Sequence, residues 1–161
     1  MAAAHARRSL TGALGILSMK TPVIPDLPGA DSLVAWFGEW PSFHDAEILA
    51  LHLDRGGVSS LKIHAWLMTR ETYEKDGHRF YRTDKHAVVI FSFECIVDLE
   101  LADCSSQSVI SGLSIDRRDD FLRLTLSPCF GLAGYIDAHT VSVAVHPGYH
   151  DQTTSTKSPN A

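Results

Sequence analysis

From residue 46 onward, apolar side chains recur at every second position through most of the chain. Leu61, Ile63, Ala65 and Leu67 alternate with more polar neighbours, and the leucines at positions 49, 51 and 53 do the same in the preceding segment. A period of two places successive side chains on opposite faces of an extended strand, so that one face is buried. Gly56-Gly57 lies between the two segments and is typical of a turn. Residues 47–55 and 59–68 are therefore predicted to form a hairpin.

Further strand-like segments follow at regular spacing. They are separated by polar or glycine-containing breaks, and they cover residues 87–93, 96–101, 109–115, 122–126 and 135–145. Before the first strand, Leu33, Val34, Phe37 and Trp40 fall at helical spacing, with a cap at Asp31 or Ser32 and Pro41 as the stop. The pattern predicts an α+β fold, mainly an antiparallel β-sheet of about seven strands with one short N-terminal helix packed on it.

The length of 161 residues fits a single domain. Three prolines between positions 21 and 29 exclude a helix or a central strand there, so residues 1–29 are predicted to be a flexible or extended arm. Residues 30–148 form the β-rich domain, and the Ser/Thr-rich residues 149–161 are predicted to be a disordered tail.

Charge and cysteine content limit the environment and the partners. The chain has 19 acidic and 14 basic side chains, which disfavours binding to nucleic acid. An acidic surface suits a basic protein partner, and the alternative is that the charge only keeps a small domain soluble. The three cysteines, Cys95, Cys104 and Cys129, form no CxxC pair; we expect them to be reduced and buried among apolar neighbours. No stretch of the sequence comes close to the roughly 18 to 20 consecutive apolar residues that a membrane-spanning helix needs. A cytoplasmic protein without a membrane partner is predicted.

An imidazole and two carboxylates crowd together at His44, Asp45 and Glu47. With a distant histidine they could form a metal or ligand site, or a small enzyme centre. In an extended segment, however, His44 and Asp45 point to opposite faces. The favoured interpretation is that His44 and Asp45 satisfy backbone groups between the helix and the first strand. No metal, cofactor or catalytic residue is predicted.

No HExxH motif, glycine-rich phosphate loop, GxSxG elbow or Cys–His nucleophile occurs in the sequence. The chain is therefore predicted to be a binding protein rather than an enzyme. Four aromatic residues precede the first strand and are expected to fill the seam between helix and sheet: Trp36, Phe37, Trp40 and Phe43.

Residues 69–85 are both charged and aromatic, and they form either a mobile loop or an exposed hairpin that turns at Asp76-Gly77. Aromatic side chains mixed with charges are typical of a protein-binding hot spot. The predicted contact residues are Tyr73, Glu74, Asp76, Phe80 and Tyr81. The alternative is that these aromatics fold back onto the sheet. A second candidate surface is the face that carries Asp98 and Glu100.

A third hypothesis is an oligomer-forming module. It would pair through an exposed strand edge, for which residues 139–146 are the candidate. The sequence leaves the oligomeric state open.

Four segments in order resemble the immunity protein 50 family of bacterial polymorphic toxin systems. They are Trp40-Pro41-Ser42-Phe43-His44-Asp45-Ala46-Glu47-Ile48, Val89-Ile90-Phe91-Ser92-Phe93, Gln107-Ser108-Val109-Ile110-Ser111-Gly112-Leu113 and Gly131-Leu132-Ala133-Gly134-Tyr135-Ile136. The resemblance covers residues 33–147, and the tryptophan-to-isoleucine run is its most specific part. It implies an immunity protein that binds and neutralises a cognate toxin domain by stoichiometric occlusion, with Trp40, Phe43, His44, Asp45 and Glu47 as its structural motif.

Overall fold

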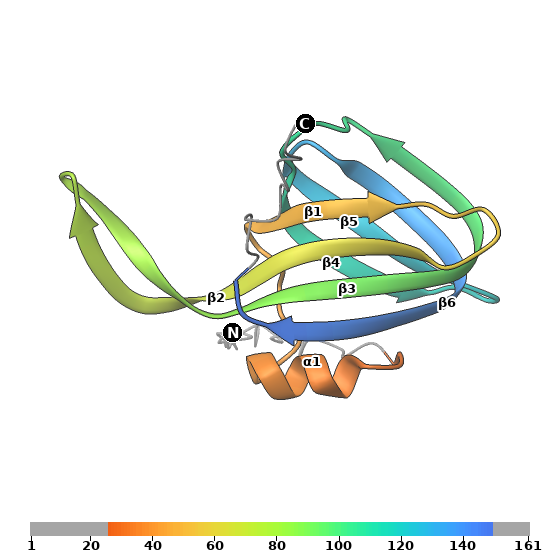
Figure 1. Cartoon of the computed structure of the whole chain (residues 1–161), viewed down its shortest axis with the longest axis horizontal. Coiled ribbons are helices and arrows are strands. Elements are labelled where there is room, and N and C mark those ends of the chain that lie inside the picture. The colour runs from red at the N-terminus through yellow and green to blue at the C-terminus, as the bar shows by residue number, and fades with distance from the viewer. Residues whose placement is uncertain (1–25, 150–161) are drawn as a thin grey trace, which may run out of the picture.

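The computed structural model describes residues 26–149, so most of the predicted N-terminal arm (1–29) and of the predicted tail (149–161) lies outside the described residues. Helix α1 (Ala30–Phe37) precedes six antiparallel strands. The strands are β1 (Ala46–His52), β2 (Ser59–Lys75), β3 (His78–Ala102), β4 (Val109–Arg117), β5 (Leu122–Phe130) and β6 (Ala133–Pro147). They form a closed barrel in the order β1-β2-β3-β6-β5-β4, from which the outer ends of β2 and β3 project as an arm (Figure 1). The predicted class, mainly antiparallel β-sheet with one short helix, is confirmed.

Residues 26–149 contain six strands, not the predicted seven. Segments 87–93 and 96–101 are parts of one strand, β3, which also includes the residues from His78 onward. One extra residue in β3 between Ile96 and Asp98 forms a bulge close to Cys95, whose φ is 53°, and pairing with β6 continues on both sides of it. Glu94 and Cys95, which suggested a gap between two strands, lie inside β3 just before this bulge.

The barrel is filled by alternating side chains from every strand. Leu61, Ile63, Val89, Phe91 and Phe93 are fully buried, as the period of two predicts. The first strand is an exception, because a bulge between Ile48 and Ala50 shifts its register and the strand ends at His52. The leucine at position 53, predicted to face the core, is therefore exposed.

Helix α1 covers the edge of β6 that faces away from β3 (Figure 1). It begins one residue before the predicted cap at Asp31, because Gly29 takes the N-cap position in a left-handed conformation. It ends at Phe37 rather than near Pro41, because Gly38 is also left-handed and donates its N–H to Val34 O.

The seam between helix and barrel is aromatic, as predicted. Phe37 and Phe43 are buried, and Phe43 contacts Phe91 with ring centroids 5.8 Å apart. The ring of Trp40 lies edge-on to that of Phe43 at 6.1 Å. Aromatic pairs in such tilted geometries add to the stability that burial gives.

The core reaches slightly beyond residues 30–148. Leu27 is buried, and the carbonyl of Pro28 accepts a hydrogen bond from the N–H of Val143 at 2.9 Å. This bond lies within 139–146, the segment proposed above for edge pairing. The opposite edge of that segment pairs with β3. At Val143, therefore, both edges of the strand already have a neighbour.

The shortest ladder in the barrel joins β1 to β4. It consists of the pairs Ala46 with Ile110 and Glu47 with Val109, and the N–H of Ile48 adds a bond to Ser108 O. All the other neighbouring strands share longer ladders. Within residues 26–149, no helix combines the length and the apolar character that crossing a membrane requires.

Candidate protein-binding arm

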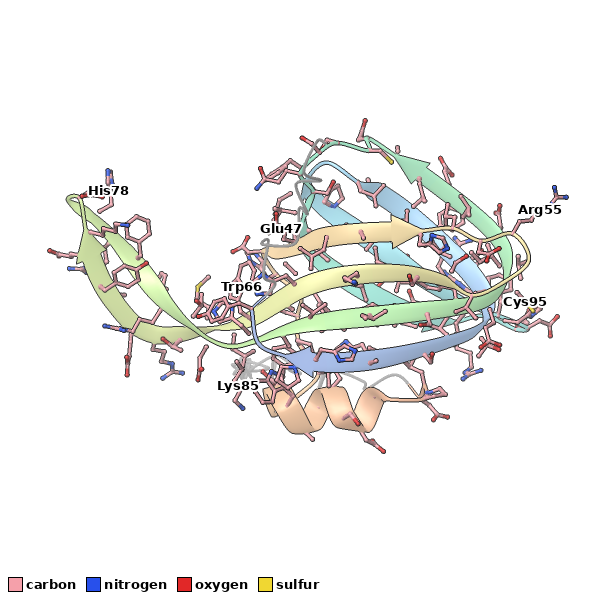
Figure 2. All side chains as sticks on the ribbon, in the orientation of Figure 1. Glu47, Arg55, Trp66, His78, Lys85 and Cys95 are labelled. Atoms are coloured by element: carbon pink, nitrogen blue, oxygen red, sulfur yellow. The ribbon has the colours of Figure 1, made fainter. Side chains whose placement is uncertain are left out.

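Residues 69–85, hereafter the arm, form a two-stranded hairpin that leaves the barrel (Figure 1). Of the two forms predicted for this segment, the structure has the exposed hairpin. Its turn is at Asp76-Gly77 as predicted, with φ angles of 52° and 76°. Two central residues with positive φ are the signature of a type I′ turn, whose twist matches that of the flanking strands. His78 marks the tip of the arm in Figure 2, far from the barrel.

One face of the arm is an aromatic and cationic ladder. Tyr73 and Phe80 are directly opposite each other and stack, with ring centroids 5.6 Å apart and planes 27° from parallel. The guanidinium carbon of Arg82 lies 5.8 Å from the centre of the Tyr73 ring. Tyr73 is 41% exposed and Phe80 43% exposed, so the two rings pack on each other rather than back on the barrel.

The other predicted contact residues lie elsewhere on the arm. Tyr81 and Glu74 alternate with Phe80 and Tyr73, so they belong to the opposite face. Tyr81 is 58% exposed. Asp76 is at the tip, in the turn. The structure therefore brings Tyr73 and Phe80 together and separates them from the other three residues.

The charge of the arm differs from that of the barrel. Five basic and four acidic side chains lie in 69–85, a formal charge of +1. The remaining described residues carry five basic and fourteen acidic side chains, a formal charge of −9. The two ion pairs of the arm, Arg79 with Glu74 and Arg82 with Glu71, are 3.7 Å long and well exposed, so they stabilise it little.

Two hydrogen bonds at Lys85 hold the base of the arm against α1. The indole N–H of Trp36 donates to the backbone O of Lys85 at 3.0 Å, and the Lys85 ammonium donates to Phe37 O at 3.3 Å. The second bond places a cation at the C-terminal end of the helix, where the helix dipole favours it. Sequence reasoning missed this contact, because Trp36 and Lys85 are 49 residues apart.

A cluster of histidine and aromatic rings also lies at the base. His86 Nδ1 is 3.2 Å from His64 Nε2, His86 Nε2 is 2.9 Å from the Thr83 hydroxyl, and the Tyr149 ring stacks on His86 at 4.0 Å. Trp66 approaches both histidines, and it is labelled beside the base of the arm in Figure 2. Burial disfavours the charged imidazole and lowers the pKa of His86, against the opposite effect of nearby Asp84.

The structure corrects the geometry expected at His44, Asp45 and Glu47. Asp45 has a φ of 62° in a turn rather than an extended segment, so its carboxylate lies 3.0 Å from His44 Nδ1 instead of pointing away. The N–H of His44 donates to the Ser42 hydroxyl. Glu47 lies on β1 opposite the backbone of His64. Among residues 26–149, no group of three or more potential ligands is arranged to hold a metal ion.

The second candidate surface, around Asp98 and Glu100, is bound into a network of the barrel wall. Tyr135 donates its hydroxyl to Asp98 at 2.9 Å, and the Arg123 guanidinium lies 3.9 Å from the Tyr135 ring centre. The hydrogen bond to Asp98 raises the pKa of Tyr135. Arg123 also forms two 2.7 Å bonds to the buried carboxylate of Asp137. Asp98 is therefore already engaged by a neighbour.

A hollow of about 390 Å³ opens at the end of the barrel opposite the arm. Leu53, Ile96 and Leu99 supply its apolar lining, while Arg55 and Cys95 contribute polar groups. Figure 2 shows Arg55 and Cys95 at that end.

The prediction that the cysteines are buried is wrong, because Cys95, Cys104 and Cys129 are all exposed free thiols.

Comparison of the chain with protein-family models, curated protein sequences and solved structures found no match.

Proposed function

We propose that this protein is a stoichiometric inhibitor that binds a partner protein domain with its arm. The observation that carries the proposal is the stacked pair of Tyr73 and Phe80, which is held away from the barrel on a hairpin with a well-formed turn. Exposed aromatic rings that are already packed together lose little conformational freedom on binding, so more of their contact energy remains as affinity.

The base of the arm supports this function. Trp36 and Lys85 fix the arm to α1, and a fixed arm costs less entropy to dock than a flexible loop. The cations of the arm favour acidic groups at the centre of the contact. The −9 charge of the barrel suits a partner whose surrounding surface is basic, because such a field speeds association.

An immunity protein that neutralises a cognate toxin domain in the cytoplasm is the biological form we propose for this inhibitor. Inhibition by occlusion needs a binding surface and no catalytic group. The free, exposed thiols of the chain suit a reducing compartment.

The proposal expects a gene for a toxin domain beside the gene for this chain, and that toxin domain is the partner to test. Titration calorimetry with the full chain should give one-to-one binding, and co-expression should rescue growth. Phe80→Ala should weaken binding by roughly 30-fold, the equivalent of about 2 kcal/mol for a hot-spot residue.

Phe130→Ala is the matched control, because Phe130 is 50% exposed but lies outside the arm. It should bind as the unaltered protein does. Equal affinity for the Phe80→Ala, Tyr73→Ala and unaltered proteins would show that the interface lies elsewhere, and failure to rescue cells would remove the immunity role.

A further inference from the structure

The outer edge of the arm formed by β3 has no neighbouring strand among the described residues. Pairing of β3 with β6 begins at Ala87, and the N–H of Gly148 adds a bond to His86 O. Residues 78–84 extend beyond that point and pair only with β2. An unpaired edge of this length presents backbone donors and acceptors to another strand.

The hairpin geometry identifies which backbone groups point outward. In a two-residue hairpin, the residues that flank the turn, here Lys75 and His78, form a hydrogen-bonded pair, and such pairs then alternate along the ladder. The outward groups of β3 therefore belong to Arg79, Tyr81 and Thr83. Lys85 continues this series, and its carbonyl does point outward, since the Trp36 indole binds it.

The two edges of the arm are not equivalent. The β2 edge is interrupted by a bulge between Met68 and Thr72, where β2 has four residue steps against two in β3. Bulges of this kind protect an edge from pairing. From His78 to Thr83 the β3 strand contains no extra residue, so its edge is the regular one.

We propose that a second copy of this chain pairs with the β3 edge of the arm, antiparallel and about a two-fold axis at Tyr81. In this register Phe80 lies opposite Arg82 of the second copy, and His78 lies opposite its Asp84. Both pairs are favourable across neighbouring strands, and no like charges are opposed.

Sliding by two residues keeps the hydrogen-bonding pattern but loses this match. In one direction Phe80 is opposite Phe80, but His78 is opposite Arg82 and loses its pairing with Asp84; in the other Arg82 is opposite Arg82. The two-fold pairing at Tyr81 is therefore the register that the side chains select.

The dimer places the two barrels at opposite ends of a four-stranded sheet, because antiparallel arms run from base to tip in opposite directions. About six backbone hydrogen bonds form over roughly 20 Å of strand. Such a small interface gives a weak, reversible dimer. The two Tyr73 and Phe80 stacks then lie on one continuous face. This inference does not depend on the proposed function, because it requires no partner other than the chain itself.

Sedimentation velocity of the full chain, from low micromolar to several hundred micromolar, tests the dimer. We expect reversible monomer–dimer exchange. Arg79→Pro removes an outward N–H from the β3 edge, and Glu74→Pro removes one from the β2 edge at the directly opposite position. Arg79→Pro should weaken the dimer at least about tenfold, the effect of losing a backbone bond together with local fit. Glu74→Pro should not weaken it. Arg79→Ala removes the same side chain but keeps the backbone N–H, so comparing it with Arg79→Pro separates the two losses.

Crosslinking fixes the register and does not need the proline variants to fold. With the three native cysteines changed to serine, Tyr81→Cys should form a disulfide-linked dimer on mild oxidation, because hydrogen-bonded partners have Cα atoms about 5.5 Å apart. Phe80→Cys, which faces Arg82 in this register, should form no disulfide-linked dimer. A protein that is monomeric at the highest concentration overturns the proposal, as does a dimer that only Glu74→Pro disrupts or that Phe80→Cys crosslinks in preference to Tyr81→Cys.

Discussion

Strands β2 and β3 run through both the barrel and the arm, and their side chains are buried in the first region and exposed in the second. In the barrel part of β2 and β3, one side of each strand faces the core, and Ile63, Val89 and Phe91 are fully buried. In the arm the same strands have both faces in solvent, and their most apolar contact is the stack of Tyr73 on Phe80. The difference shows that a strand can leave its sheet when a good turn and cross-strand pairs replace burial, and that its side chains are then available for recognition.

The largest contrast is expected from truncating one aromatic in each region. Phe91→Ala leaves a cavity in the barrel core and should lower the free energy of unfolding by about 3 to 5 kcal/mol. Phe80→Ala removes a half-exposed ring of the arm and should lower it by less than about 1 kcal/mol. Urea unfolding of both variants measures the two values. Equal losses would mean that the arm belongs to the cooperative core of the fold.

A glycine in each region gives the next comparison. A Cβ at Gly134, on β6, would collide with the backbone carbonyl of Glu100 on β3, whereas one at Gly77 in the turn of the arm would meet open space. Both have positive φ, so each alanine carries backbone strain of about 1 to 2 kcal/mol. Gly134→Ala should therefore cost more than Gly77→Ala by thermal unfolding. The reverse order would contradict the close approach of β3 and β6.

Removing the contact that joins the two regions should have a smaller effect. Trp36→Phe deletes the indole N–H that binds Lys85 O and should cost about 1 kcal/mol. Amide hydrogen exchange should accelerate in the arm more than in the barrel. Trp40→Phe is the control, because its ring contact with Phe43 can be kept by phenylalanine. If both variants exchange alike, the arm is held by something other than this bond.

Acidification should give the smallest effect, confined to the base of the arm. The pKa of His86 is lowered in the fold, so the unfolded chain binds a proton first as the pH falls below about 6.5, and stability decreases there. Above that range His86 is neutral in both the folded and the unfolded chain, so it no longer makes the free energy of unfolding depend on pH. Unfolding at pH values on both sides of this range, compared between the unaltered protein and His86→Gln, measures the effect. A pH dependence that persists unchanged in His86→Gln would assign it to other groups.

The sequence was most informative where a local rule decides the structure. Asp76-Gly77 predicted the turn of the arm, and the alternation around Ile63 predicted the buried face of β2. It was least informative where bulges change the register. The bulge between Ile96 and Asp98, close to Cys95 with its positive φ, made one strand look like two, and the change of register before Ala87 brings His86 beside His64. A period of two cannot show an inserted residue, because each half of the strand still alternates correctly.

The predicted binding residues were correctly placed in an exposed segment, but their division between two faces was not foreseen. Tyr73 and Phe80 share a face only because the turn has two residues, and a longer turn would have paired Phe80 differently. The hydrogen bonds from Trp36 and Lys85 link distant parts of the chain and leave no pattern in the sequence.

The short ladder between β1 and β4 has a consequence for the order in which the barrel folds. It joins segments about 60 residues apart along the chain through very few backbone pairs. Closing so long a loop costs entropy that grows with the logarithm of its length, and this cost comes before the few new bonds can offset it. The other ladders should therefore form first and the β1–β4 seam last. During unfolding the seam between β1 and β4 should open first. A partly unfolded molecule is then a curved open sheet whose free edges are β1 and β4.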